Sequence, residues 1–220
     1  MGTTRNGLLR SINGRVGPVV VANSDDDVSI VRILPKLSTK PPKQAQLNQR
    51  EIFKAVMKFV KQNQEVMRIG YQSYKGAVKP LNAAASFILK NAVTGVYPNY
   101  KIDYSAVQTS EDSGAIGGVA ESTMVPVAGG KVTITWDPTQ SYSGTKELLR
   151  NLDDAVIMLL NETSGYAGSR TGLATRGSGT ATVRIPISHP GDKVHAWLFF
   201  ASVDGKVTPS QYMGPIVALE

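Results

Sequence analysis

The sequence reads Lys131-Val132-Thr133-Ile134-Thr135-Trp136 where its alternation of polar and apolar side chains is cleanest. Successive side chains of a β-strand point to opposite faces, so Val132, Ile134 and Trp136 share one face. The stretch Thr180–Ile187 alternates in the same way. Both stretches therefore predict half-buried strands that turn an apolar face towards a core.

Similar strand-like segments fill the chain after Tyr97-Pro98, where Thr, Val, Ser and Gly dominate. About seven short strands with regular Gly and Pro turn signals are typical of an antiparallel β-sandwich of immunoglobulin or fibronectin type. Its core would hold aliphatic side chains and Trp136 or Trp197, because the chain has no cysteine. The predicted strands are Tyr100–Thr109, Gly117–Pro126, Lys131–Trp136, Ala155–Asn161, Ala181–Ile187, Val194–Ser202 and Tyr212–Leu219.

The residues before Tyr97 carry the helical signals. Apolar residues recur at helical spacing from Gln44 to Arg68, which predicts one amphipathic helix. A second helix is predicted over Pro80–Thr94, because Pro suits its first turn and the following Gly its end. Arg15–Asn23 and Val28–Leu34 are predicted to pair as a hairpin with Ser24–Asp27 as its turn.

The fold class expected from these elements is α+β, with an N-terminal β-hairpin plus two helices followed by the sandwich. We predict a basic hairpin-and-helix domain with an extended N-terminal arm over residues 1–100, and an immunoglobulin-like β-sandwich domain over residues 101–220. The charge changes sign at the same place. Residues 1–101 have sixteen Lys and Arg against five Asp and Glu, a net charge of +11, whereas residues 102–220 have eight against twelve, a net charge of −4. Such asymmetry indicates two units with different partners.

Basic side chains gather in a stripe roughly 80° wide on the first predicted helix. Further lysines lie in the Pro-containing connector before it. The stripe predicts contact with a polyanion or with an acidic protein surface, and a solvated helix face is the alternative. The helix belongs to no recognised DNA-binding motif. Nucleic acid is therefore one of several candidate partners. The candidate contact residues are Lys36, Lys40, Lys43, Arg50, Lys54, Lys58, Lys61 and Arg68.

Two segments are predicted to be loops at the ends of the sandwich, Tyr142–Leu148 and the Gly-rich Gly165–Gly179. Loops held on a rigid scaffold often carry recognition, and a merely flexible loop is the alternative. If these loops bind a glycan or a surface protein, Tyr142 and Tyr166 are the stacking candidates. Arg170 and Arg176 are the basic side chains of the second loop.

The sequence indicates no catalytic, cofactor or metal site. It has no Cys and two His, His189 and His195, which excludes thiolate and His-rich metal sites. No Gly-x-Ser-x-Gly elbow frames a nucleophile. The adjacent carboxylates of Asp153 and Asp154 would point to opposite faces of a strand. Asp25–Asp27 lacks the spacing of a calcium loop and is predicted to lie in a hairpin turn. We therefore expect a protein that is not an enzyme.

No apolar run approaches the roughly 18–20 residues of a membrane helix. The N-terminus lacks the apolar core of a secretion signal. We expect no membrane span, and a location in a virion or other particle, or outside the cell by a non-standard route.

Several short motifs are shared with a known family. They are Arg5–Leu9, Asn13–Gly17 with Val19–Val21, Val31–Lys36, then Pro41, Gln46, Arg50 and Phe53, and later Pro80–Ala84, Asn91–Gly95 and Tyr97–Tyr104. On these motifs the chain resembles an uncharacterised family of domains of unknown function found largely in Bacteroidota. The resemblance is strongest up to Tyr104 and looser in the β-rich half. It implies no activity.

The function expected from these observations is that of a non-enzymatic structural subunit of a multi-copy assembly, such as a phage virion component or an extracellular fibre. Oppositely charged halves allow copies to associate head to tail, and other assembly proteins or an anionic surface are further partners. An extended N-terminal arm could add a strand to a neighbouring sheet. The alternatives are a glycan- or surface-protein-binding immunoglobulin-like module and a sequence-independent nucleic-acid binder.

Overall fold

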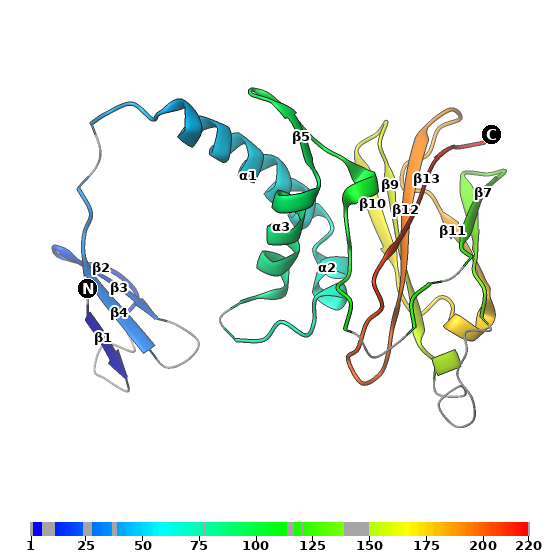
Figure 1. The fold of residues 1–220 in the computed structure, drawn as a ribbon, viewed down its shortest axis with the longest axis horizontal. Helices are drawn as coiled ribbons and strands as arrows, with labels where there is room; N and C mark the ends of the chain where they lie inside the picture. The colour runs from blue at the N-terminus through cyan, green and yellow to red at the C-terminus, as the bar shows by residue number, and fades with distance from the viewer. Residues whose placement is uncertain are drawn as a thin grey trace.

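The computed structural model describes residues 2–5, 12–23, 28–36, 39–76, 78–113, 117–119, 121–138 and 150–219. Along the chain these residues form a small N-terminal sheet, three helices, a short hairpin and a β-sandwich. The helices lie between the N-terminal sheet and the sandwich (Figure 1).

The sandwich consists of two antiparallel sheets. One has the strand order β10-β9-β12-β13 and the other has the order β11-β8-β7. The predicted α+β class, with a β-sandwich of immunoglobulin or fibronectin type, is therefore confirmed. The strand bounds are β7 Thr123–Val127, β8 Lys131–Thr135, β9 Asp154–Asn161, β10 Tyr166–Arg170, β11 Thr180–Arg184, β12 Lys193–Ala201 and β13 Gln211–Val217.

The space between the two sheets holds one hydrophobic core. Val132, Ile134 and Trp136 are buried there, on the face that their alternation predicts. They meet apolar side chains of β9 and β12, and the rings of Trp136 and Phe200 lie 5.9 Å apart in an edge-on arrangement. Burial of aromatic and aliphatic side chains between the sheets stabilises the sandwich.

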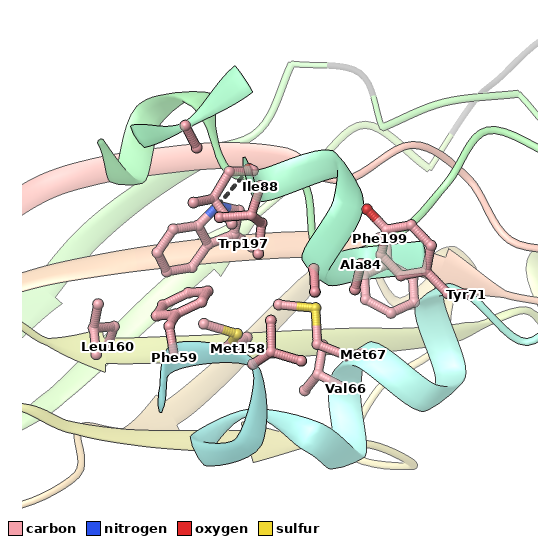
Figure 2. Packing of buried hydrophobic residues seen from close by; sticks show 14 of the residues in the cluster. Phe59, Val66, Met67, Tyr71, Ala84, Ile88, Met158, Leu160, Trp197 and Phe199 are labelled. Atoms are coloured by element: carbon pink, nitrogen blue, oxygen red, sulfur yellow. Dashed lines mark hydrogen bonds between the residues drawn. The ribbon is translucent and has the colours of Figure 1, made fainter. Parts of the chain in front are cut away.

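Three helices cover the outer face of the β10-β9-β12-β13 sheet of the sandwich. They are α1 Gln44–Gln62, α2 Gln64–Gly70 and α3 Pro80–Asn91. Phe59, Met67 and Ile88 of the helices pack in a second hydrophobic core with Met158 of β9 and Trp197 of β12 (Figure 2). This core crosses the boundary predicted between residues 100 and 101, because helix side chains and sheet side chains fill it together.

The first predicted helix is in fact two helices. Asn63 separates them, and both its backbone N–H and its side-chain Nδ2 donate to the Phe59 carbonyl, at 3.2 and 2.9 Å. A side chain that bonds its own backbone in this way competes with continued helix. The prediction of a single helix through Arg68 is therefore wrong, and Arg68 lies on α2.

The second predicted helix ends three residues early, at Asn91. The chain then forms a two-stranded hairpin of β5 Val93–Val96 and β6 Asn99–Ile102. The predicted strand Tyr100–Thr109 is therefore a strand only as far as Ile102, and a 3₁₀ turn follows at Tyr104–Ala106. Val93 and Thr94 are β-branched residues that favour strand over helix, and they pair with the next strand β6.

The predicted N-terminal hairpin is confirmed as β3 Val19–Asn23 and β4 Val28–Ile33, and its turn, with Asp25–Asp27, lies outside the described residues. Two further strands, β1 Gly2–Arg5 and β2 Gly14–Val16, complete a sheet in the order β1-β4-β3-β2. Since β1 pairs with β4 of its own chain, this strand is not an arm extended towards a neighbour. The sheet lies apart from the rest of the molecule (Figure 1).

Candidate functional site

The basic face predicted from the sequence is present as an exposed surface. Its side chains are all solvent-exposed, those of α1 opposite the buried Val56 and Val60. Lys54 lies 3.8 Å from Glu51, an exposed pair of the kind that contributes little stability. What this face contacts stays a prediction. The exposed residues are Lys36, Lys40 and Lys43 of the connector, Arg50, Lys54, Lys58 and Lys61 of α1, and Arg68 of α2.

The structure describes only one of the two predicted ligand loops, Gly165–Gly179. Tyr142, with the rest of the segment Tyr142–Leu148, lies outside the described residues. Gly165–Gly179 is not one long loop, because it contains strand β10 and a 3₁₀ turn at Arg176–Ser178. Tyr166 and Arg170 are exposed at the two ends of β10. The strand forms because β10 pairs along its whole length with β9.

Arg176 is buried, so the prediction that it contacts a ligand from a mobile loop is wrong. Its guanidinium carbon lies 4.3 Å from the centre of the Phe200 ring, and its Nη2 lies 3.6 Å from an oxygen of Asp153. The same Nη2 donates to the Gly117 carbonyl at 3.0 Å. Burial raises the pKa of the Asp153 carboxyl, and the positive charge of Arg176 opposes that rise. Arg176 thus anchors its turn to the core.

A cleft of about 710 Å³ lies beside β10, between this strand and the segment 185–190. We call it the β10 cleft. Three basic side chains line it, Arg170 of β10, Arg184 of β11 and His189, and no described carboxylate does so. The two arginines belong to different sheets. The sandwich therefore places two arginines from strands of different sheets on one cleft.

Glycines make room for the cleft. A Cβ on Gly168 would lie 2.9 Å from Pro186, so the strand could not pass the opposite wall with a larger residue. Gly130 has a φ of +67°, and a Cβ there would lie 3.3 Å from the Ser188 side chain. Ile187 in the wall also has a positive φ, of 40°. A β-branched residue in this region is strained, and such strain persists only where its surroundings impose it.

Hydrogen bonds hold the strained wall in place. The Asn161 side chain donates to the Ile187 carbonyl at 2.9 Å and to an Asp192 carboxylate oxygen at 2.7 Å. The same Asp192 oxygen accepts the His189 backbone N–H at 2.9 Å. The side-chain bond from Asn161, followed by the His189 bond, lowers the pKa of the Asp192 carboxyl.

The lowered pKa of Asp192 predicts acid-sensitive stability. The unfolded chain binds the proton more readily than the native one, so stability falls as the pH drops from about 5 towards the native pKa. In Asp192→Asn we expect the free energy of unfolding to fall less than in the wild type over that range. Urea titrations at several pH values measure this slope. Asn161→Ala, which removes the main donor, should also flatten it, and an unchanged slope in both variants contradicts the assignment.

The two histidines lie in different surroundings. His189 has an exposed side chain in the wall of the cleft. His195 is buried, with its Nδ1 2.7 Å from the Tyr212 hydroxyl and its Nε2 3.2 Å from a Glu162 oxygen. The sequence interpretation of His195 as a structural residue agrees with these contacts.

Sequence reasoning missed Arg184, Ser188 and His189 as neighbours of Arg170. No spacing rule joins them to β10, since the packing of the two sheets brings them together. Within the described ranges, no group of three or more His, Asp or Glu side chains is placed to hold a metal ion. In the same ranges, no helix combines the length and the apolar character needed to cross a membrane.

Comparison with known proteins gives a fold likeness and a family. The fibronectin type III domain of the human collagen α-1(XX) chain is similar to this chain, with 9% sequence identity and a TM-score of 0.37. That likeness covers 50% of this chain and 93% of the domain. No curated protein matches the sequence. A family of unknown function, DUF6266, matches residues 11–214, which include the β-rich half as well as the helices. The chain therefore belongs to the family of unknown function DUF6266.

Proposed function

We propose that this chain is a non-enzymatic structural subunit of a multi-copy assembly, such as a phage virion component or an extracellular fibre. Its N-terminal sheet would pack on a neighbouring copy. The observation that carries the proposal is the apolar face of this sheet. Its members are Val16, Val19, Val21, Val31 and Ile33.

The strand register gathers these five side chains. Val16 lies opposite Val19, which lies opposite Ile33, and Val21 lies opposite Val31. Residues directly opposite each other in antiparallel strands share a face. Val21 is 3% exposed, whereas Val16 is 51% and Ile33 80% exposed. One end of the apolar face is therefore open to solvent.

The N-terminal sheet lies away from both cores of its own chain. Neither hydrophobic core includes a described residue of β1–β4. A small sheet gains independent stability by packing an apolar face against another element. Since the sheet lies apart from its own helices and sandwich (Figure 1), a partner surface is the element that would complete it.

Charge favours another copy of the chain as that partner. The connector and α1, which follow the N-terminal sheet along the chain, expose a basic face, and residues 102–220 carry a net charge of −4. Opposite charges steer association and fix orientation. A contact between unlike surfaces of successive copies gives a ring if it closes and a filament if it does not.

The mass of the protein in solution tests this proposal. We expect the wild type to sediment as several copies at high concentration and low salt. Adding charge to the apolar face with Val16→Lys and Ile33→Lys should give the monomer mass. Val203→Lys is the matched control, since Val203 is 97% exposed and lies in a turn of the sandwich. A monomeric wild type, or association that the double variant retains, contradicts the proposal.

The β10 cleft supports a second function, recognition of a ligand by the sandwich. It is a concave surface with several convergent polar groups, which is the usual form of a small-molecule site. Its two arginines come from two sheets. Binding at this cleft and assembly through the N-terminal sheet use different surfaces, so one chain could do both.

A further inference from the structure

We propose that the β10 cleft binds an acidic saccharide, with the sugar carboxylate between Arg170 and Arg184 and a sugar ring against Tyr166. The site deepens the second function, ligand recognition by the sandwich. It does not depend on self-association through the N-terminal sheet.

The charge of the cleft selects an anion. Arg170 and Arg184 both line it, and no described Asp or Glu does. Among the residues that the structure describes, neither arginine forms an ion pair, and the one side-chain hydrogen bond of Arg170 goes to the Ser169 carbonyl at 2.8 Å. A guanidinium presents a planar fork of N–H donors that matches a carboxylate. Two such groups on one cleft provide a site for a carboxylate-bearing ligand.

A buried hydroxyl adds a second polar feature. Ser188 lines the cleft, and its Oγ is buried without a hydrogen-bond partner among the described residues. A buried polar atom without a partner is unfavourable, so a ligand that supplies the missing hydrogen bond is favoured. A sugar hydroxyl can either donate to or accept from this oxygen.

Tyr166 provides a platform for a ring. Alternate residues of a strand share a face, so Tyr166, Gly168 and Arg170 lie on one face of β10. Gly168 and Arg170 line the cleft, and Tyr166, which is 54% exposed, continues that face beyond Gly168. The C–H face of a sugar ring packs against an aromatic ring, while its hydroxyls stay free to bond. Two arginines and a serine that line the cleft, with an exposed ring beside it, together match an acidic saccharide.

Both arginine-bearing strands are sheet edges, and charged side chains on edge strands also prevent aggregation. This role and ligand binding differ in one measurable way. If the arginines only protect the edges, replacing them increases aggregation and the wild type binds no saccharide. If they bind the ligand, replacing them weakens binding in protein that stays soluble.

Titration calorimetry of the full chain tests the proposal. The probes are uronate- and sialate-bearing oligosaccharides, neutral oligosaccharides of equal length, and inorganic phosphate. We expect the wild type to bind at least one acidic oligosaccharide, and at least about tenfold more tightly than its neutral counterpart. Arg170→Gln with Arg184→Gln should weaken that binding about tenfold or more, and Tyr166→Ala should weaken it by a smaller factor. Lys206→Gln, an exposed charge at another turn, should leave it unchanged.

Three outcomes would overturn the proposal. They are a wild type that binds none of the acidic oligosaccharides, equal affinity for acidic and neutral ones, and binding of phosphate as tight as that of the saccharide. Circular dichroism of each variant checks that it is folded. The arginine variant should keep the wild-type mass, and Val16→Lys with Ile33→Lys should keep saccharide binding. Failure of the cleft and failure of assembly are therefore distinguishable.

Discussion

Trp197→Ala is expected to lower the free energy of unfolding by about 3–5 kcal/mol, the usual loss for a buried tryptophan. Trp197 has no exposed surface and lies where the helices meet the sheet (Figure 2). Its ring lies 5.4 Å from the Tyr212 ring, and its indole N–H donates to the Val107 carbonyl at 3.1 Å. Truncation leaves a cavity between helices and sheet and removes the hydrogen bond to Val107.

The chain has two tryptophans, so removing one allows the unfolding of the sandwich to be followed by the fluorescence of the other. In Trp197→Ala the remaining fluorescence comes from Trp136, which lies in the core between the two sheets. We expect helical circular dichroism and Trp136 fluorescence to report one urea transition, because a shared core couples helices to sandwich. Trp197→Phe keeps a ring and should cost only about 1–3 kcal/mol. A loss below 1 kcal/mol for the alanine variant contradicts this account, and so do separate transitions by circular dichroism and Trp136 fluorescence in Trp197→Phe.

Asp153→Ala is expected to lower the free energy of unfolding by about 3–5 kcal/mol, because it removes the carboxylate that faces the buried Arg176. Asp153 is also 3.5 Å from Arg150, so its charge lies between two guanidinium groups. The double variant Asp153→Ala with Arg176→Met should be more stable than Asp153→Ala alone, because methionine carries no buried charge. Denaturant unfolding at neutral pH gives the three free energies. A double variant less stable than Asp153→Ala contradicts the pairing.

The single variant Arg176→Met tests whether Arg176 belongs to the ligand site. Arg176→Met should lower stability yet leave saccharide binding unchanged in the folded protein, since Arg176 does not line the β10 cleft. Replacing Arg170 should instead weaken saccharide binding and leave stability unchanged. The sequence places both residues in one Gly-rich segment and cannot distinguish them.

Most strands could be predicted because each carries its own pattern. Lys131–Thr135 alternates polar and apolar residues, and the structure buries its apolar face. β10 could not be predicted, because Tyr-Ala-Gly-Ser-Arg has neither alternation nor a run of strand formers. It is a strand because the edge of β9 offers it a full set of backbone partners.

The three-layer arrangement was also missed, although a signal was present. Ala155–Leu160 and Val194–Phe200 are continuously buried, with no alternation between core and solvent. Uninterrupted apolar strands are typical of sheets covered on both faces. That pattern could have predicted helices on the outer face of the sheet, and with them a core shared across residue 100.

Local periodicity and charge in the sequence are enough to predict the α+β class, the helical and β-rich regions of the chain, and the exposed basic face. Which side chains meet depends on the tertiary structure. Packing of two sheets places Arg170 and Arg184 on one cleft, burial against Phe200 removes Arg176 from the surface, and pairing with β4 makes β1 part of a sheet where an extended arm was expected. These contacts join residues far apart in the chain, and local patterns carry no information about such distances.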